Sequence, residues 1–171
     1  MNVKRITLDA LLTAIALTIF TVELQIPSIV PIPGVKLGLA NIVTIFAIFL
    51  LGRRDAACIL LARILLGGIF SGRVIALLYS LAGGLLCYLA MLVMQKLVTE
   101  KQIWVCSVVG AVAHNVGQIA AAVLVTGTPA ILSYLPVLMV SGISAGACTG
   151  LCGQFVVNRA RKLFVTGKNP R

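Results

Sequence analysis

Acidic side chains are scarce in this chain of 171 residues, which holds four of them against fourteen Lys and Arg. They are scattered singly, at Asp9, Glu23, Asp55 and Glu100. Diphosphate chemistry depends on clustered carboxylates that hold magnesium ions. The spacing of the acids therefore argues against an active site for such chemistry within this chain, and any carboxylate cluster would have to come from a partner.

Other catalytic and metal-binding signatures are also missing. His114 is the only histidine, and Ser107 lies two helical turns from it, beyond hydrogen-bond reach, so no nucleophile has an evident base. There is no GxxxxGK[ST] phosphate loop, which predicts that the chain does not hydrolyse ATP itself. The five cysteines form no CxxC pair and fall in or beside apolar runs, where they fit packing better than metal ligation. We therefore predict a protein that is not an enzyme and that has no metal and no cofactor.

Apolar residues are abundant instead. They make up 60% of the chain, too much for a soluble globule. A membrane-spanning helix needs about 20 apolar residues, and only helices and closed barrels satisfy their backbone groups in lipid. No period-2 alternation of the barrel type is present. The sequence thus predicts an all-α polytopic membrane protein.

We count six apolar runs, and together they predict a six-transmembrane-helix bundle that forms a single integral membrane domain over residues 1–171. The Ser71-Gly72-Arg73 segment leaves room only for a tight turn between the third and fourth runs. The second and third runs are short for a bilayer, and the sixth is long enough to tilt across it. The predicted spans are 6–24, 37–52, 55–70, 74–94, 104–126 and 130–157.

Basic residues are unevenly distributed among the segments between these runs. Lys and Arg in short loops favour the cytoplasm. If the N-terminus is inside, eleven of the fourteen basic residues are cytoplasmic. Only Lys36 and Arg73 are then outside, and Arg63 lies inside a span. We predict a multi-pass protein of the cell membrane with both termini cytoplasmic. The net charge of +10 then reflects topology and attraction to membrane lipid headgroups, and no nucleic-acid partner is expected.

The N-terminus resembles a signal peptide in that Lys4 and Arg5 precede an apolar stretch. The stretch is too long, however, and lacks a small-x-small cleavage site. We expect it to remain as a signal anchor.

Small residues recur at helix-packing spacing, which lets helix backbones approach closely. Gly142, Gly146 and Gly150 are four apart in the sixth run, and Ala113, Gly117 and Ala121 in the fifth. Packing within the bundle is the favoured interpretation of both sets. The first run carries Ala10 and Ala14 in an A-x-x-x-A arrangement, which by itself is a weak signal.

Polar residues within the spans are the sharper signal, because they are costly in hydrocarbon and usually face a cavity or one another. With the predicted orientation they converge on the outer half of the bundle, as a pocket loaded from outside requires. Arg63, Lys36 and Arg73 outnumber the one nearby acid, Glu23, so we expect an anionic ligand. The predicted substrate-binding residues are Asn41, Arg63, Tyr79, His114, Asn115, Gln118 and Tyr134.

A structural alternative stays open for these residues. Arg63 could pair with helix carbonyls, and His114, Asn115 and Gln118 could join the fifth helix to a neighbour. The Pro-rich segment 27–34 cannot be helical throughout, and it fits a lid over a pocket and a plain connector equally well.

Four segments carry a resemblance to a known family: V-K-L-G-L-A-N-I-V-T (35–44), Y-S-L-A-G-G (79–84), G-A-V-A-H-N-V-G-Q (110–118) and Y-L-P-V-L (134–138). The chain resembles the Gx transporter family, often labelled heptaprenyl diphosphate synthase component I, which is similar to the substrate-binding S components of energy-coupling factor (ECF) transporters. The resemblance implies six helices, an outward-side pocket capped by the loop after the first helix, and partner docking through the A-x-x-x-A face. Ala10 and Ala14 match that docking motif. The substrate does not carry over.

Three functions follow as hypotheses. The leading one is a subunit that binds a small-molecule solute and works with ECF-type coupling and ATPase subunits in uptake. The second takes the label literally, as a membrane subunit associated with a polyprenyl (heptaprenyl) diphosphate synthase. The third, a structural subunit of a larger membrane complex, does not explain the outer polar residues.

Overall fold

The computed structural model describes residues 3–25, 38–72 and 74–166, apart from the side chains of residue 100 and of 163–166. These residues form six α-helices and two short 3₁₀ helices, and none of them is in a strand. The predicted all-α architecture and its six helical segments are confirmed. The α-helices are α1 (Val3–Glu23), α2 (Asn41–Leu50), α3 (Arg53–Ser71), α4 (Val74–Leu97), α5 (Ile103–Thr126) and α6 (Leu135–Thr166), and the 3₁₀ helices are η1 (Glu100–Gln102) and η2 (Pro129–Tyr134).

The second helix is shorter than the apolar run that predicts it. The run covers 37–52, but α2 begins at Asn41 and ends at Leu50. The backbone of Gly38 has φ +77°, which no helix can include, and Gly52 has φ +115° beyond the other end. Ten residues rise only about 15 Å, roughly half of the hydrocarbon core, so α2 by itself does not cross a membrane.

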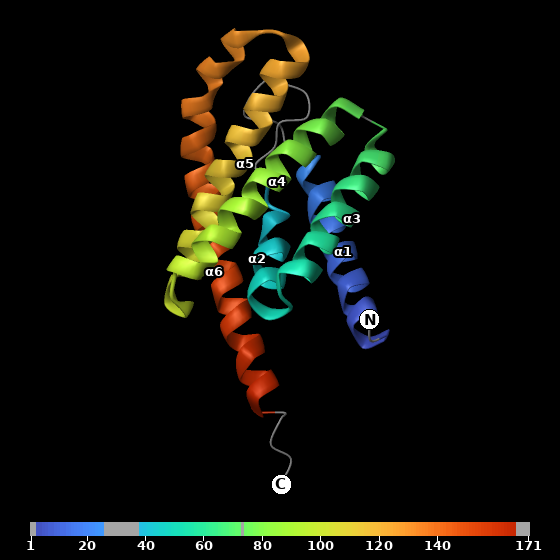
Figure 1. Ribbon diagram of the computed structural model, residues 1–171, viewed down its shortest axis with the longest axis vertical. Coiled ribbons are helices and arrows are strands. Elements are labelled where there is room, and N and C mark those ends of the chain that lie inside the picture. Colours follow the sequence, from blue (N-terminus) through green and yellow to red (C-terminus); the bar gives the residue numbers. More distant parts are fainter. Residues whose placement is uncertain (1–2, 26–37, 73, 167–171) are drawn as a thin grey trace.

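Four helical segments are long and apolar enough to span a membrane: Val3–Glu23, Val74–Leu97, Ile103–Thr126 and Pro129–Lys162. The helix α3 has 19 residues, but it is not one of the four, because it opens with Arg53, Arg54 and Asp55 and carries Arg63 in its middle. At about 1.5 Å per residue, the 32 residues of α6 exceed the hydrocarbon thickness, and Figure 1 shows its end projecting beyond the bundle. The chain is a membrane protein.

The helix α2 lies at the centre of the bundle and contacts every other α-helix of the described chain. The strongest pairings are α4 with α5 and α5 with α6, while α1 packs mainly on α3 (Figure 1). Side chains of α2 such as Ile45 and Ile48 are almost fully buried. A short helix surrounded in this way places its first residue deep within the protein, which matters for the site below.

Glycines fix the spacing of the α4, α5 and α6 backbones. A Cβ at Gly117 would lie 2.7 Å from the carbonyl oxygen of Ala82 in α4, and one at Gly146 would lie 2.9 Å from Cα of Val108 in α5. Gly142 and Gly150 also face α5. The interpretation of the α6 glycines and of Gly117 as packing positions within the bundle is confirmed.

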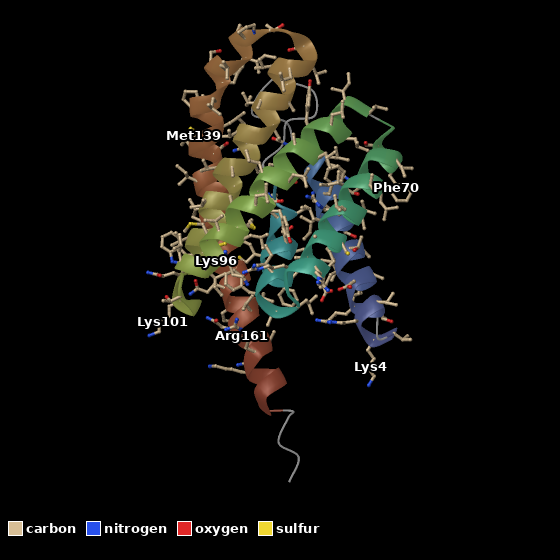
Figure 2. The ribbon with its side chains drawn as sticks, viewed as in Figure 1. Lys4, Phe70, Lys96, Lys101, Met139 and Arg161 are labelled. Atoms are coloured by element: carbon tan, nitrogen blue, oxygen red, sulfur yellow. The ribbon has the colours of Figure 1, made fainter. Side chains whose placement is uncertain are left out.

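Basic side chains of α1, α4, η1 and α6 lie toward one end of the molecule (Figure 2). The N-terminal end of α1 and the C-terminal end of α6 lie at that end (Figure 1). Lys4, Lys96, Lys101 and Arg161 lie toward it, while Phe70 and Met139 lie toward the other end (Figure 2). Lys36, Arg73 and the Pro-rich segment 27–34 are outside the described residues.

Candidate functional site

Buried polar side chains from five helices gather in the bundle. Each of them is at least 94% buried, although each stands in an otherwise apolar protein where such burial costs free energy. Six of the seven predicted binding residues belong to this set, and the exception is Tyr134. The set, called the polar cluster below, consists of Glu23 of α1, Asn41 and Thr44 of α2, Arg63 of α3, Tyr79 and Ser80 of α4, and His114, Asn115 and Gln118 of α5.

Gly38 connects three members of the cluster. Its N–H donates a hydrogen bond to Oε1 of Glu23, the last residue of α1. A Cβ at Gly38 would lie 2.8 Å from Nδ2 of Asn41 and 3.0 Å from Cδ2 of His114. The turn that precedes α2 therefore sits directly against both side chains, and only glycine fits there.

Two adjacent glycines of α4 form the opposite wall. A Cβ at Gly83 would lie 2.8 Å from Cγ of Gln118 and 3.1 Å from Cε1 of His114. One at Gly84 would lie 2.8 Å from Cδ1 of Ile64 and 3.9 Å from Nη2 of Arg63. The imidazole of His114 thus lies between the α2 turn and α4, and Arg63 borders the same stretch of α4.

Arg63 is the cationic member of the cluster among the described residues. Its side chain is 3% exposed, and the carboxylate of Glu23 interacts with it electrostatically. Its Nε and Nη2 atoms are buried and have no hydrogen-bond partner within the described segments. A buried guanidinium in this condition is unusual, because an unmade hydrogen bond to a charged group is costly.

Asn115 and Asn41 differ in how much of their amide is used. Asn115 donates from Nδ2 to the carbonyl oxygen of Leu138, which ties α5 to α6, as the alternative interpretation of this segment expects. Its Oδ1 is buried and finds no partner in the described part of the chain. For Asn41 the same holds for both Nδ2 and Oδ1. The contact between helices therefore uses one of the two polar atoms of the Asn115 amide. Among the described residues, neither polar atom of the Asn41 amide is used in this way.

The two predicted tyrosines lie in different surroundings. Tyr79, a member of the polar cluster, is 2% exposed and also packs with the apolar side chains of Ile119, Ala122 and Leu138. Tyr134 lies in η2 and is 37% exposed, so the structure does not bring it into the buried set.

The sequence analysis missed the part played by Gly38, Gly83 and Gly84, and it treated Glu23 only as the one acid near the predicted pocket. The signal was present in the motifs V-K-L-G-L-A-N and Y-S-L-A-G-G, whose glycines touch the polar side chains. The sequence shows that Glu23 is an acidic residue, but only the fold shows that the turn before α2 contacts it and that it is buried.

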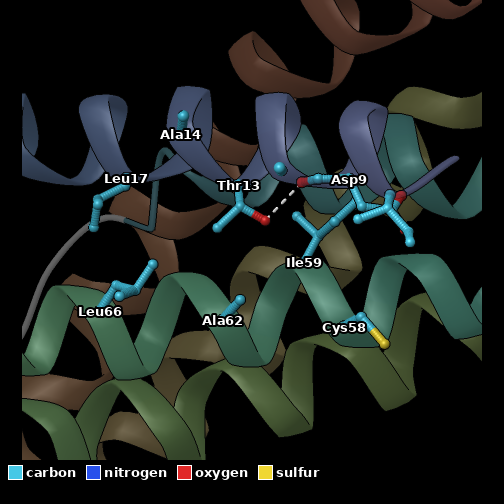
Figure 3. Close-up of a pocket in the computed structure, with 10 residues that line it drawn as sticks. Asp9, Thr13, Ala14, Leu17, Cys58, Ile59, Ala62 and Leu66 are labelled. Atoms are coloured by element: carbon cyan, nitrogen blue, oxygen red, sulfur yellow. Dashed lines mark hydrogen bonds between the residues drawn. The ribbon is translucent and has the colours of Figure 1, made fainter. Parts of the chain in front are cut away.

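The predicted docking residues lie elsewhere, in an apolar groove between α1 and α3 (Figure 3). Ala10 and Ala14 are both exposed on the bundle surface and line this groove, which encloses about 440 Å³. Toward the basic end of the groove, Arg5 forms a 3.3 Å salt bridge to Asp55 that joins the two helices. The groove and the polar cluster are separate features that share α1 and α3.

The fold and the cluster together define a class: a helical membrane protein with a buried polar cluster, in which several polar atoms have no hydrogen-bond partner among the described residues. The model of the family described as "Heptaprenyl diphosphate synthase component I" matches residues 12–156, and the chain belongs to that family. Comparison with curated proteins found no match. Comparison with solved structures found none either.

Proposed function

We propose that this protein is the solute-binding membrane subunit of an uptake system. It captures a small organic anion at the outer face of the cell membrane and works by binding rather than by catalysis. ECF-type coupling and ATPase subunits supply the energy. The observation that carries the proposal is the polar cluster, in which Arg63 and Asn41 are buried while several of their hydrogen-bonding atoms have no partner among the described residues.

The cluster suits ligand binding better than helix packing. A structural polar network is stabilising when its groups satisfy one another, and each buried group left unsatisfied costs roughly 1–3 kcal/mol. Asn41, whose amide atoms have no partner among the described residues, is the buried first residue of α2. The positive end of that helix dipole also favours an anionic ligand.

Topology supports loading from outside. Cytoplasmic loops attract Lys and Arg, and the labelled basic residues lie toward the end that holds the start of α1 (Figure 2). The cluster includes the last residue of α1 and the first of α2, at the opposite end of α1. With both termini cytoplasmic, it lies in the outer half of the membrane.

Partner docking is assigned to the groove between α1 and α3. Ala10 and Ala14 expose a small-residue face there, which lets a second helix approach closely. We expect Ala10→Trp and Ala14→Trp to abolish uptake while ligand binding persists. Ala120→Trp, at an exposed alanine of α5, is the matched control and should leave uptake intact.

A second candidate function rests on the family description. That description names a component of a synthase, which favours a membrane subunit that assembles with a polyprenyl diphosphate synthase. The buried Arg63 would then meet a diphosphate group. This candidate needs catalytic carboxylates from the partner, because the acids of this chain are scattered singly.

One experiment separates the two. The protein is purified from its native host in mild detergent, and co-purifying proteins and small molecules are identified by mass spectrometry. Coupling and ATPase subunits with a bound organic anion support the uptake function. A prenyl diphosphate synthase, with neither those subunits nor a bound solute, contradicts it and supports the second candidate.

A further inference from the structure

One edge of the buried Arg63 guanidinium makes no hydrogen bond to the part of the chain that the structure describes. Nε and Nη2 lie on the same edge, and both are buried without a hydrogen-bond partner in the described segments. Their N–H bonds run nearly parallel, and such a fork fits the two oxygens of a carboxylate or phosphate group. A point charge such as a lysine ammonium does not offer this geometry.

Asparagine atoms supply the complementary groups. Nδ2 of Asn41 is an open donor, whereas Oδ1 of Asn41 and Oδ1 of Asn115 are open acceptors within the described chain. A ligand that satisfies Asn41 in full must present both an acceptor and an N–H or O–H donor. A simple fatty acid, which has a carboxylate and nothing else polar, leaves these atoms unsatisfied.

A series of close contacts links Asn41 to Arg63. Asn41 and His114 meet at Gly38, His114 also meets Gly83, and the neighbouring Gly84 borders Nη2 of Arg63. These contacts run from α2 through α5 and α4 to α3.

The charge of the cluster selects among oxyanions. Within the described residues it contains one cation, Arg63, and one acid, Glu23, which interact electrostatically. A monocarboxylate adds one negative charge, which would face the Nε–Nη2 edge of Arg63. A diphosphate adds two or three beside the Glu23 carboxylate in a medium where an uncompensated charge is expensive.

We propose that the ligand of the polar cluster is a small monocarboxylate that carries a second group with both a hydrogen-bond donor and an acceptor, as the hydroxyl group of a hydroxy acid does. Its carboxylate lies on the Nε–Nη2 edge of Arg63, and its second group pairs with the amide of Asn41. This rests on the proposed solute-binding function and specifies its ligand.

The test is equilibrium dialysis of the purified protein in lipid nanodiscs against a defined equimolar mixture. The mixture contains small 2-hydroxy acids, the primary carboxamide and the phosphate monoester of each, and inorganic diphosphate. Retained compounds are quantified by mass spectrometry. At least one carboxylate should be retained about tenfold or more over its own carboxamide, which corresponds to the loss of one charge-assisted contact pair.

Variants examine the geometry of the fork. Arg63→Lys keeps the charge but removes the two-donor edge, and it should lower retention of the carboxylate about tenfold or more. Arg54→Lys makes the same exchange at an exposed position of the same helix and should change nothing. The comparison of acid with carboxamide on the unaltered protein stands even if Arg63→Lys does not fold.

Three results would overturn the inference: preference for diphosphate or a phosphate monoester, equal retention of acids and carboxamides, or retention of no carboxylate at all. Equal binding by folded Arg63→Lys would also contradict it. These failures are distinct from failure of the uptake function, which requires that native purification recover a prenyl synthase with neither a bound solute nor coupling subunits.

Discussion

The backbone N–H of Gly38 donates to Oε1 of Glu23, so the turn before α2 is fastened to the last residue of α1. The same glycine has φ +77° and leaves no room for a Cβ beside Asn41 and His114. One position therefore joins the backbone of the turn, an acid and two predicted ligand-binding side chains. Its substitution tests whether the polar cluster is a precisely fitted site.

Gly38→Ala should destabilise the protein through two effects. The left-handed backbone costs a non-glycine residue about 1 kcal/mol, and the added methyl group displaces Asn41 or His114, for a further cost of about 1–3 kcal/mol. Gly127→Ala is the control, because Gly127 has φ +64° with nothing within 4 Å of its Cβ position. Thermal unfolding in detergent should therefore show a larger loss for Gly38→Ala, and equal losses would mean that the close approach is unimportant.

Glu23 and Arg63 should be energetically coupled. Glu23→Gln keeps an oxygen that accepts the Gly38 N–H but removes the charge that interacts with Arg63. Removal of one partner leaves the other charge buried and uncompensated. Each single variant, Glu23→Gln or Arg63→Gln, should therefore lower the free energy of unfolding by more than half of the loss measured for the double variant. A double-mutant cycle of unfolding free energies should give a coupling of about 0.5–3 kcal/mol. Additive effects would show that the two groups do not stabilise each other.

The backbone contact between α4 and α5 predicts a steep cost at Gly117. An added Cβ would lie 2.7 Å from the Ala82 carbonyl oxygen and 2.9 Å from Cα of Gly83, so Gly117→Ala must push the two helices apart, at about 1–3 kcal/mol. Gly153→Ala is the matched control in α6, where the nearest atoms are 3.7 Å away on Ile42 and Ile45. It should be neutral or stabilise by up to about 1 kcal/mol, since alanine is the better helix former. Unfolding free energies of the two variants that do not differ would contradict this assignment of the α4–α5 interface.

The sequence predicted the helices well wherever hydropathy alone decides them. The runs 74–94 and 104–126 closely match α4 and α5, since both are long, apolar and bounded by loops. It failed at the second run because hydropathy does not register backbone conformation. Gly38 and Gly52 both adopt positive φ and reduce a 16-residue run to ten helical residues.

The candidate site divides in a similar way. Polar residues such as Asn41 and Arg63 stand out within hydrophobic runs. Because a polar side chain in the hydrocarbon costs free energy, their position alone was enough to identify them as candidate site residues. Whether a polar residue near a helix end is buried depends on the fold, and this is why Glu23 belongs to the cluster while Tyr134 in η2 does not. The glycines that shape the cluster carry no chemical signal of their own and needed the structure.

The orientation in the membrane gives the last prediction. With both termini cytoplasmic, the turn at Gly127 faces outward and η1 faces the cytoplasm. In a background with Cys58, Cys87, Cys106, Cys148 and Cys152 replaced by alanine or serine, Gly127→Cys should react with a membrane-impermeant maleimide on intact cells. Lys101→Cys, which is exposed in η1 at the basic end of the bundle, should react only after the cells are opened. The opposite pattern would place the polar cluster in the cytoplasmic half, where a ligand from outside has no access, and it would contradict uptake while leaving ligand binding itself possible.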